Sequence, residues 1–264
     1  MNYALVTGGS SGMGLEYVRQ LAERGYNIIV VALRQEETDA AKELVLRDYP
    51  NIDILSLGMD LSCIDSPLKL YEKVKCERPD AFVEVLINNA GILYPKHFKN
   101  MTDPQVSRII MLHNHTTAML CHYFLPDMLE RKRGYILNIS SLAAEFQYPF
   151  ISLYAATKAF TKVFTRALRT ELKGSGVVAS SIYFGAVSTP LYNLSDNLRK
   201  LAITLGVMIT PEKASRIALK MLFKGKSGKT PGLINKIALV VAKILPHPVV
   251  AMIDKFVTKK WNFD

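Results

Sequence analysis

Short apolar runs alternate with longer amphipathic stretches along most of the 264-residue chain. Each run suits a buried strand, and the stretches between the runs repeat apolar side chains every three or four residues, as helices do. The expected strands span residues 4–6, 28–32, 52–57, 85–87, 135–139 and 177–182. The expected helices span residues 14–24, 36–48, 64–77, 104–130, 151–173 and 211–223. This alternation predicts βαβ units and a mainly parallel sheet with helices on both faces.

The expected fold class is therefore a doubly wound α/β fold, that is, a Rossmann fold. No internal repeat or linker divides the chain, so residues 1–264 are expected to form a single domain. The regular alternation stops near Ser188. Residues 188–210 carry many apolar side chains and are expected to cover a substrate, although core packing would explain the same residues. Residues 230–264 are expected to form an amphipathic C-terminal extension.

The cysteines and the start of the chain favour the cytoplasm. Cys63, Cys76 and Cys121 form no C-x-x-C pair, so neither a disulfide framework nor a zinc site is expected. Residues 3–7 already have the pattern of a strand, where a signal peptide would need a basic region followed by an apolar one. Residues 237–253 are apolar, but prolines and a lysine interrupt them, so they are poorly suited to span a bilayer.

Positive charge is concentrated toward the C-terminus. The formal net charge is +10, and residues 213–260 hold Arg216 and ten lysines against a single acid, Asp254. Such a segment can contact nucleic acid or an anionic lipid surface, or simply face solvent. No nucleic-acid motif accompanies it, so we expect no nucleic-acid partner.

The same region repeats apolar residues at helical spacing, with lysines near the edge of the apolar face. The residues are Ile237, Val240, Val241, Ile244 and Leu245. A helix of this kind can lie on an anionic membrane, each lysine adding about 1 kcal/mol of attraction. It can equally pack against a second subunit or against the chain's own cleft. We therefore expect a cytoplasmic homo-oligomer, either free or peripheral on the inner face of a membrane.

A glycine-rich loop follows the first expected strand and leads into the first expected helix. It spans residues 7–14 and reads TGGSSGMG. Glycines permit a tight turn and close backbone approach, and a helix N-terminus offers unpaired N–H groups to a pyrophosphate. A turn without a ligand is the alternative, but the position within a βαβ series favours dinucleotide binding.

Tyr154 and Lys158 form a Y-x-x-x-K pattern, and this spacing places both side chains on one helix face. A nearby ammonium favours the phenolate and moves the tyrosine pKa down from about 10 toward neutral pH, where it can act as an acid or base. Such pairs also arise by chance on helix surfaces. Ser141, at the end of the fifth expected strand, lies where parallel sheets bind ligands, although Ser140 is adjacent to it.

Together these motifs resemble those of the short-chain dehydrogenase/reductase family over about residues 3–190. The loop matches the family's T-G-x-x-x-G-x-G, residues 88–91 match its N-N-A-G, and residues 154–158 match its Y-x-x-x-K. The resemblance implies catalytic roles for Asn114, Ser141, Tyr154 and Lys158. It implies a cofactor held by Gly8, Ser10, Ser11, Gly12, Met13, Gly14, Arg34, Asp60, Leu61, Asn88, Ala90, Gly91, Tyr154, Lys158, Gly185, Val187 and Thr189.

The family also implies a division of labour among these residues. Ser141 would hold the substrate oxygen, Asn114 would hold a water that leads from the lysine to solvent, and Asp60 and Asn88 would flank the adenosine. One departure is Phe184-Gly185, where the family usually has Pro-Gly. Gly185 and Thr189 are still expected to approach the nicotinamide, but the turn that precedes them is expected to differ.

The end of the second strand indicates which dinucleotide binds. An acid there would bond the 2′-hydroxyl of NAD and repel the 2′-phosphate of NADP. This chain has Leu33 at that place, followed by Arg34, a cation suited to a phosphate. NADP(H) is therefore the expected cofactor, although a lone arginine after a strand is otherwise most often solvated.

No metal is expected beside the cofactor. His113 and His115 flank Asn114, but side chains two residues apart on a helix point in different directions. Core or solvated histidines are far commoner than metal ligands.

We therefore expect an NADP(H)-dependent oxidoreductase that moves a hydride between the nicotinamide and a small hydrophobic ketone or secondary alcohol, with Tyr154 as acid and base. The C-terminal segment resembles those of hydroxysteroid dehydrogenases and 3-ketosphinganine reductases, which implies a steroid or a 3-keto lipid such as 3-ketosphinganine. A non-catalytic dinucleotide-binding regulator is the alternative. It would keep the glycine loop but need not keep Ser141, Tyr154 and Lys158.

Overall fold

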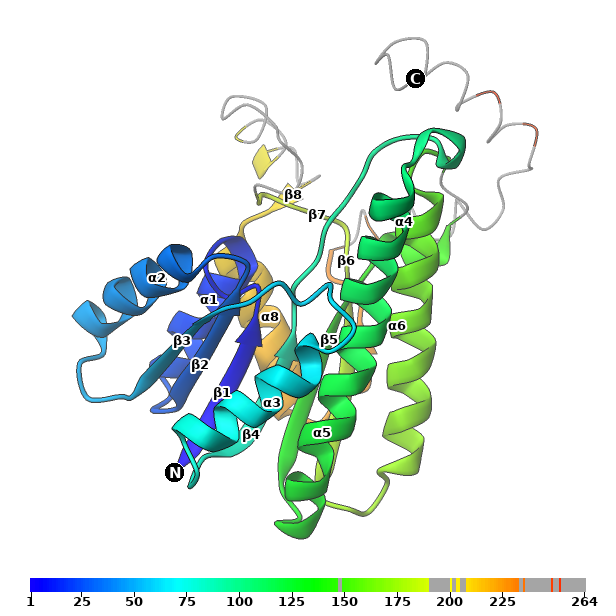
Figure 1. Ribbon diagram of the computed structural model, residues 1–264. Coiled ribbons are helices and arrows are strands. Elements are labelled where there is room, and N and C mark those ends of the chain that lie inside the picture. The colour runs from blue at the N-terminus through cyan, green and yellow to red at the C-terminus, as the bar shows by residue number, and fades with distance from the viewer. Residues whose placement is uncertain are drawn as a thin grey trace.

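The computed structural model describes residues 1–146, 149–189 and 208–232 and the separate positions 200, 203, 204, 235, 248 and 252. Within these residues, parallel strands form a central sheet in the order β3-β2-β1-β4-β5-β6-β9 (Figure 1). The strands are β1 (Asn2–Thr7), β2 (Asn27–Ala32), β3 (Ile54–Gly58), β4 (Phe82–Asn88), β5 (Gly134–Ser141), β6 (Val177–Phe184) and β9 (Gly228–Lys229). The predicted doubly wound α/β fold is confirmed.

Helices cover both faces of the sheet (Figure 1). They are α1 (Gly12–Ala22), α2 (Gln35–Asp48), α3 (Ser66–Glu77), α4 (Asp103–Ile110), α5 (Thr116–Glu130), α6 (Ser152–Glu171) and α8 (Pro211–Phe223). Alternate side chains of β1 enter different cores. Ala4 and Val6 share a core with α1 and α8, whereas Tyr3 and Leu5 share one with α3 and α5. Burial on both faces explains why the strands are nearly continuous apolar runs in the sequence.

The strand order reverses between β1 and β4. β1 pairs with β2 on one side and with β4 on the other, although β4 comes later in the chain than β3. In such sheets the loops at the carboxyl ends of the two central strands diverge, and this opens a crevice for a ligand. The fold therefore directs the loops after β1 and β4 to one place.

The predicted helix over residues 104–130 is interrupted. Residues Met111–His115 form a π-helical turn between α4 and α5, in which the N–H of Thr116 bonds to the carbonyl of Met111. Pro104 lies in the first turn of α4, where a missing N–H costs little. A π turn holds one residue more than an α turn and is often found at functional sites.

Three short strands escaped the sequence analysis. β7 (Ala186–Val187) pairs with β8 (Met208–Ile209), and β9 adds an edge to the main sheet. β9 thus continues the sheet at residues 228–229, where the sequence predicted no strand. Most of segments 188–210 and 230–264 lies outside the described residues. No helix in the described part of the chain is long and apolar enough to cross a membrane.

Candidate active site

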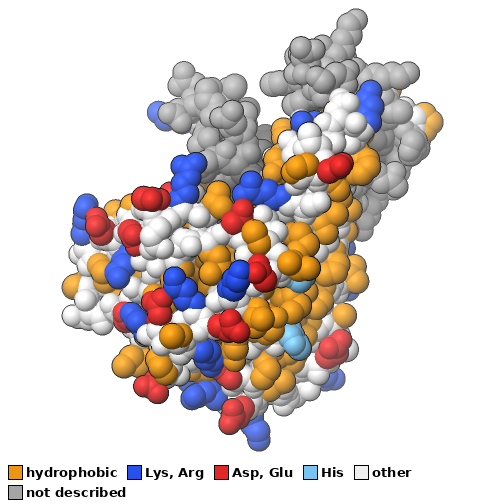
Figure 2. Space-filling model, viewed as in Figure 1, with side chains coloured by type: hydrophobic (Ala, Val, Ile, Leu, Met, Phe, Trp, Pro, Cys, Tyr) orange, Lys and Arg blue, Asp and Glu red, His pale blue; other side chains and the backbone are white. Residues whose placement is uncertain are grey.

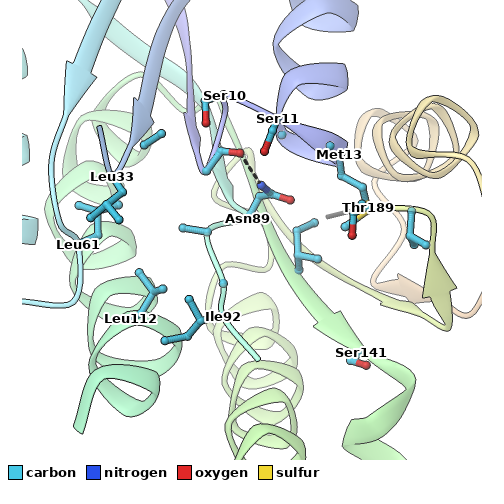
Figure 3. Close-up of a pocket in the computed structure, with 18 of the residues that line it drawn as sticks. Ser10, Ser11, Met13, Leu33, Leu61, Asn89, Ile92, Leu112, Ser141 and Thr189 are labelled. Carbon is cyan, nitrogen blue, oxygen red and sulfur yellow. Dashed lines mark hydrogen bonds between the residues drawn. The ribbon is translucent and has the colours of Figure 1, made fainter. Parts of the chain in front are cut away.

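A cavity of about 310 Å³ opens at the carboxyl ends of the strands (Figure 3). Side chains and backbone from both halves of the sheet line it. The lining residues are Gly8, Ser10, Ser11, Gly12, Met13, Gly14, Ala32, Leu33, Glu37, Met59, Asp60, Leu61, Asn89, Ala90, Gly91, Ile92, Arg108, Leu112, Ile139, Ser140, Ser141, Tyr154, Lys158, Phe184, Gly185, Val187 and Thr189.

The glycine loop has the geometry that a pyrophosphate needs. Gly8 has a φ of +64°, and a Cβ on Gly14 would lie 1.8 Å from the carbonyl oxygen of Gly8, so both positions require glycine. α1 begins at Gly12 with no acidic residue in its first turn, and the Ser11 side chain makes no capping bond. The first N–H groups of α1 therefore remain available to an anion. The residues present fit a dinucleotide.

Asn89 holds the glycine loop against β4 (Figure 3). Its Nδ2 donates to the carbonyl oxygens of Thr7 and Gly8 at 3.0 and 3.2 Å. The Thr7 hydroxyl oxygen accepts the backbone N–H groups of Asn89 and Ala90, each at 3.0 Å. The second asparagine of the N-N-A-G motif therefore shapes the phosphate site, and the sequence analysis did not identify it.

Asn88 does not line the cavity, although the resemblance placed it beside the adenosine. It is 6% exposed, and its Nδ2 donates to Oδ1 of Asn138 at 2.8 Å. Asn138 in turn donates to Thr165 on α6 at 2.9 Å. The first asparagine of the motif therefore ties β4 to β5 and α6 beneath the site.

Charged side chains surround the end of the cavity where β2 and β3 finish. Glu37 and Leu33 line the cavity, whereas Arg34 lies outside the lining with its Nη1 3.7 Å from Oε1 of Glu37. Ser10 Oγ lies 3.5 Å from the other oxygen of Glu37. The expected phosphate-binding arginine is therefore paired with an acid that the sequence analysis missed. The only signal was an acid in the first turn of the helix that begins after Arg34.

Asp60 and Leu61 line the cavity at the place that the resemblance gives to the adenosine. Arg108 of α4 lies 3.2 Å from Oδ2 of Asp60 and closes this side. Partial burial disfavours the Asp60 carboxylate, but hydrogen bonds from Ser62 and the charge of Arg108 hold its pKa below the usual value. Asp60 is therefore an anion that accepts hydrogen bonds.

α6 contributes Tyr154 and Lys158 to the wall of the cavity. Lys158 Nζ lies 5.6 Å from the centre of the Tyr154 ring and donates to the carbonyl of Ile139 at 3.0 Å. Burial lowers the pKa of Lys158 to about 8. The side chain is therefore a buried cation that loses its proton readily and lies next to the tyrosine.

The two adjacent serines at the end of β5 make different bonds. The Ser140 hydroxyl donates to the carbonyl of Lys158 at 2.8 Å, so its proton is engaged within the protein. The Ser141 oxygen accepts the N–H of Ala143 at 3.1 Å, at the start of the short 3₁₀ helix Leu142–Glu145. That bond uses a lone pair and leaves the Ser141 proton for another acceptor. Of the two, Ser141 is thus the one that can donate into the cavity.

The remaining predicted site residues divide into two groups. Gly185, Val187 and Thr189 line the cavity, and Figure 3 labels Thr189. A Cβ on Gly185 would lie 2.4 Å from Oδ1 of Asn235, so any larger residue there would displace the Asn235 side chain. Asn114 lies in the π turn and not on the cavity wall, and its Oδ1 is buried without a hydrogen-bond partner among the described residues.

No cluster of metal ligands occurs in the part of the chain that the structure describes. The fold and the cavity define a dinucleotide-binding α/β architecture. A family model described as short chain dehydrogenase matches residues 2–198. The chain belongs to this family of oxidoreductases, as its motifs predicted.

Curated relatives resemble the chain in sequence, and solved structures resemble it in fold. The very-long-chain 3-oxoacyl-CoA reductase of Bos taurus is 28% identical over 249 residues, which cover 92% of this chain and 75% of the relative. A short-chain dehydrogenase from Sphingobium yanoikuyae in complex with NADPH shares the fold with a TM-score of 0.78 at 23% identity, over 94% of this chain and 97% of the other. A 7beta-hydroxysteroid dehydrogenase superimposes with a TM-score of 0.84 at 20% identity, over 97% and 96% of the two chains.

Proposed function

We propose that the protein is an NADP(H)-dependent reductase of hydrophobic ketones in which Tyr154 is the acid and base. One observation carries the proposal. The phosphate-type glycine loop and the group formed by Ser141, Tyr154 and Lys158 line the same cavity. A bound dinucleotide with its pyrophosphate on the loop would reach that group with its nicotinamide. A regulator that only binds a dinucleotide would not need the second group.

The roles of the side chains follow from their bonds. When bound, NADPH supplies a hydride to the substrate carbonyl carbon. Ser141 donates its free proton to the carbonyl oxygen, and Tyr154 donates the proton that completes the alcohol. Lys158 holds the nicotinamide ribose and, as a nearby cation, lowers the cost of the phenolate that remains. In the reverse direction the tyrosinate accepts the proton from the alcohol.

The apolar end of the cavity favours a hydrophobic substrate. Ile92 and Ala143 pack with Tyr154 in a separate apolar cluster next to the cavity. The named relatives include very-long-chain 3-oxoacyl-CoA reductases and a hydroxysteroid dehydrogenase-like protein of Gallus gallus. We therefore propose a 3-keto lipid, such as a long-chain 3-oxoacyl thioester or 3-ketosphinganine, ahead of a steroid ketone. The proposed cover, residues 188–210, lies mostly outside the described residues.

A turnover screen tests the proposal. NADPH oxidation is measured with a long-chain 3-oxoacyl-CoA, 3-ketosphinganine, a steroid ketone and a short-chain 3-oxoacyl-CoA, each with NADH in parallel. We expect the long-chain 3-keto lipids to have the highest kcat/KM, because every buried methylene adds about 0.8 kcal/mol of binding. NADPH binding without turnover of any ketone would contradict the reductase and leave the regulator.

Arg34 and Glu37 provide opposite tests of the cofactor. Arg34→Ala should weaken NADPH about tenfold or more and leave NADH nearly unchanged, since a charge-assisted bond contributes roughly 1.5–3 kcal/mol. Glu37→Gln should strengthen NADPH severalfold, because it removes an anion from the cavity wall next to Ser10. Breaking the exposed ion pair between Arg34 and Glu37 when the cofactor binds costs little, because such pairs contribute about 1 kcal/mol or less.

Both predictions are tested by the dissociation constants of NADPH and NADH, measured for each variant by quenching of protein fluorescence. Arg47→Ala, on the last turn of the same helix, is the charge-matched control and should change neither constant. Equal losses of NADPH and NADH in Arg34→Ala would show that Arg34 does not contact the 2′-phosphate.

We also propose that the protein is a homo-oligomer. Apolar side chains gather over the part of the surface where α5 lies (Figure 2). Leu129 of α5 and Phe160 and Val163 of α6 are exposed, and Phe160 stacks on Phe164. The contact of residues 230–264 with an anionic membrane, or with a second subunit, lies outside the described residues and stays a prediction.

A further inference from the structure

His113 is buried beside the proposed catalytic group although its sequence pattern favoured neither a metal nor a catalytic role. The ring lies in the π turn, is 2% exposed and meets the Tyr154 ring edge-on with centroids 5.7 Å apart. A Cβ on Gly91 would lie 3.1 Å from His113 Nε2 and 3.7 Å from Lys158 Nζ. His113 and Lys158 thus lie against the same point of the cavity wall.

Both ring nitrogens of His113 are bonded, and the partners determine where its proton lies. The backbone N–H of Ile92 points to Nε2 at 3.0 Å, and a backbone amide can only donate, so Nε2 carries no proton. The neutral ring must then carry its proton on Nδ1, which lies 2.8 Å from Oγ1 of Thr157. The Thr157 hydroxyl is left to donate to the carbonyl of Tyr154 at 2.8 Å.

These bonds form a directed chain from the cavity wall to the proposed acid. It runs from the Ile92 amide through the His113 ring and the Thr157 hydroxyl to the Tyr154 backbone. Burial and the neighbouring Lys158 ammonium hold the pKa of His113 well below its usual value, so the chain keeps one direction at neutral pH. Neither Asn nor Gln could replace His113 in this chain, because each has a polar atom at only one of the positions of Nδ1 and Nε2. Only one of the bonds to Ile92 and Thr157 would then remain.

We propose that His113, acting through Thr157, is a positioning residue that fixes the first turn of α6 against the N-N-A-G segment and so sets the approach of Tyr154 to the substrate. This inference rests on the proposed function of Tyr154. His113 touches neither the reacting atoms nor the proton that is transferred. Its loss therefore changes kcat through geometry, and misplacement by about 1 Å can cost about a hundredfold.

Four variants test the chain of bonds. His113→Phe keeps the ring and removes both bonds, and Thr157→Val keeps the shape and removes the hydroxyl. Each should lower kcat for a long-chain 3-oxoacyl-CoA about ten- to a hundredfold with NADPH affinity within about threefold of wild type. The double variant should be no slower than the slower single variant, because both break one chain. Thr157→Ser retains the hydroxyl and should restore most of the rate.

Thr165→Val is the matched control, because it removes another buried hydroxyl from the same helix. Thr165 accepts from Asn138 and does not line the cavity, so its loss should lower the melting temperature and leave kcat unchanged. Multiplicative losses in the double variant, or a kcat within about twofold of wild type in His113→Phe, would overturn the positioning role.

Histidine-ring ¹⁵N NMR of the full chain provides a readout that does not depend on turnover. The His113 signal, assigned by its loss in His113→Phe, should show the proton on Nδ1 and no titration near pH 6.5. An Nε2–H ring, or titration near pH 6.5, would disprove the chain of bonds. Full turnover in Tyr154→Phe would instead overturn the proposed function, whatever the His113 variants do.

Discussion

Replacing Tyr154 with phenylalanine should lower turnover at least a hundredfold and leave NADPH binding nearly intact. The change removes the proton donor and keeps the ring, and positioned acid–base groups contribute roughly 10²–10⁴-fold to rate. Tyr154 is 9% exposed and packs with Ile109 and Ala155, contacts that phenylalanine would keep. Single-turnover NADPH oxidation and NADPH titration of the same preparation measure the two quantities separately.

A second tyrosine offers a matched control. Tyr183 is also 9% exposed and lies 5.7 Å from the ammonium of Lys162, much as Tyr154 lies near Lys158, but it does not line the cavity. Tyr183→Phe should retain turnover close to wild type. If Tyr154→Phe keeps more than a few per cent of the rate, or if both variants lose it equally, Tyr154 is not the acid.

The sequence predicted the sheet well because strands that are buried on both faces are apolar at most positions and are therefore easy to recognise. Each long strand appears as a mostly apolar run, with few polar residues inside it, such as Glu84 in β4 and Ser180 in β6. Most expected boundaries differ from the structure by two residues or fewer. β7, β8 and β9 have two residues each, too few for any period to show. Their pairing depends on contacts with distant parts of the chain, as for Gly228 against Ser181.

The motif residues were easier to name than to orient. Adjacent residues on a strand point to opposite faces, so the sequence alone could not decide between neighbours. The structure places Asn89 on the cavity and turns Asn88 into the core. It likewise leaves the Ser141 proton available, whereas the proton of Ser140 is used within the protein.

Tertiary context explains the residues that the sequence analysis overlooked. Glu37 looks like an ordinary acid near a helix N-terminus until the structure brings it to Ser10, a loop residue of the preceding βα unit. His113 looked like an ordinary core or solvated histidine in a regular helix. The π turn around it leaves no mark in the apolar periodicity, so its contacts with Ile92 and Thr157 could not be foreseen.

Lys158→Met should nearly abolish turnover and at the same time make the ligand-free protein more stable at neutral pH. The ammonium is buried, and its pKa falls from 10.5 to about 8, which corresponds to a cost of about 3 kcal/mol for keeping the charge at pH 7. Methionine fills similar space without a charge. Loss of the hydrogen bond to the Ile139 carbonyl destabilises the variant by about 1 kcal/mol and so offsets part of this gain. The remaining gain in the free energy of unfolding should raise Tm by roughly 5 °C.

The pH dependence of this gain distinguishes a buried charge from better packing. Between pH 8 and 10.5 the unfolded chain binds more protons at Lys158 than the folded chain, so this group makes folding more favourable as the pH rises. The Tm advantage of Lys158→Met should therefore be full below pH 8 and shrink toward pH 10.5.

Lys162→Met is the control on the next turn of α6. Lys162 pairs with Glu145, so its removal leaves a carboxylate in a half-buried place and should lower Tm. A Tm advantage of Lys158→Met that stays constant with pH would mean that Lys158 binds protons equally in the folded and unfolded chains, so that burial does not lower its pKa and the gain comes from packing alone.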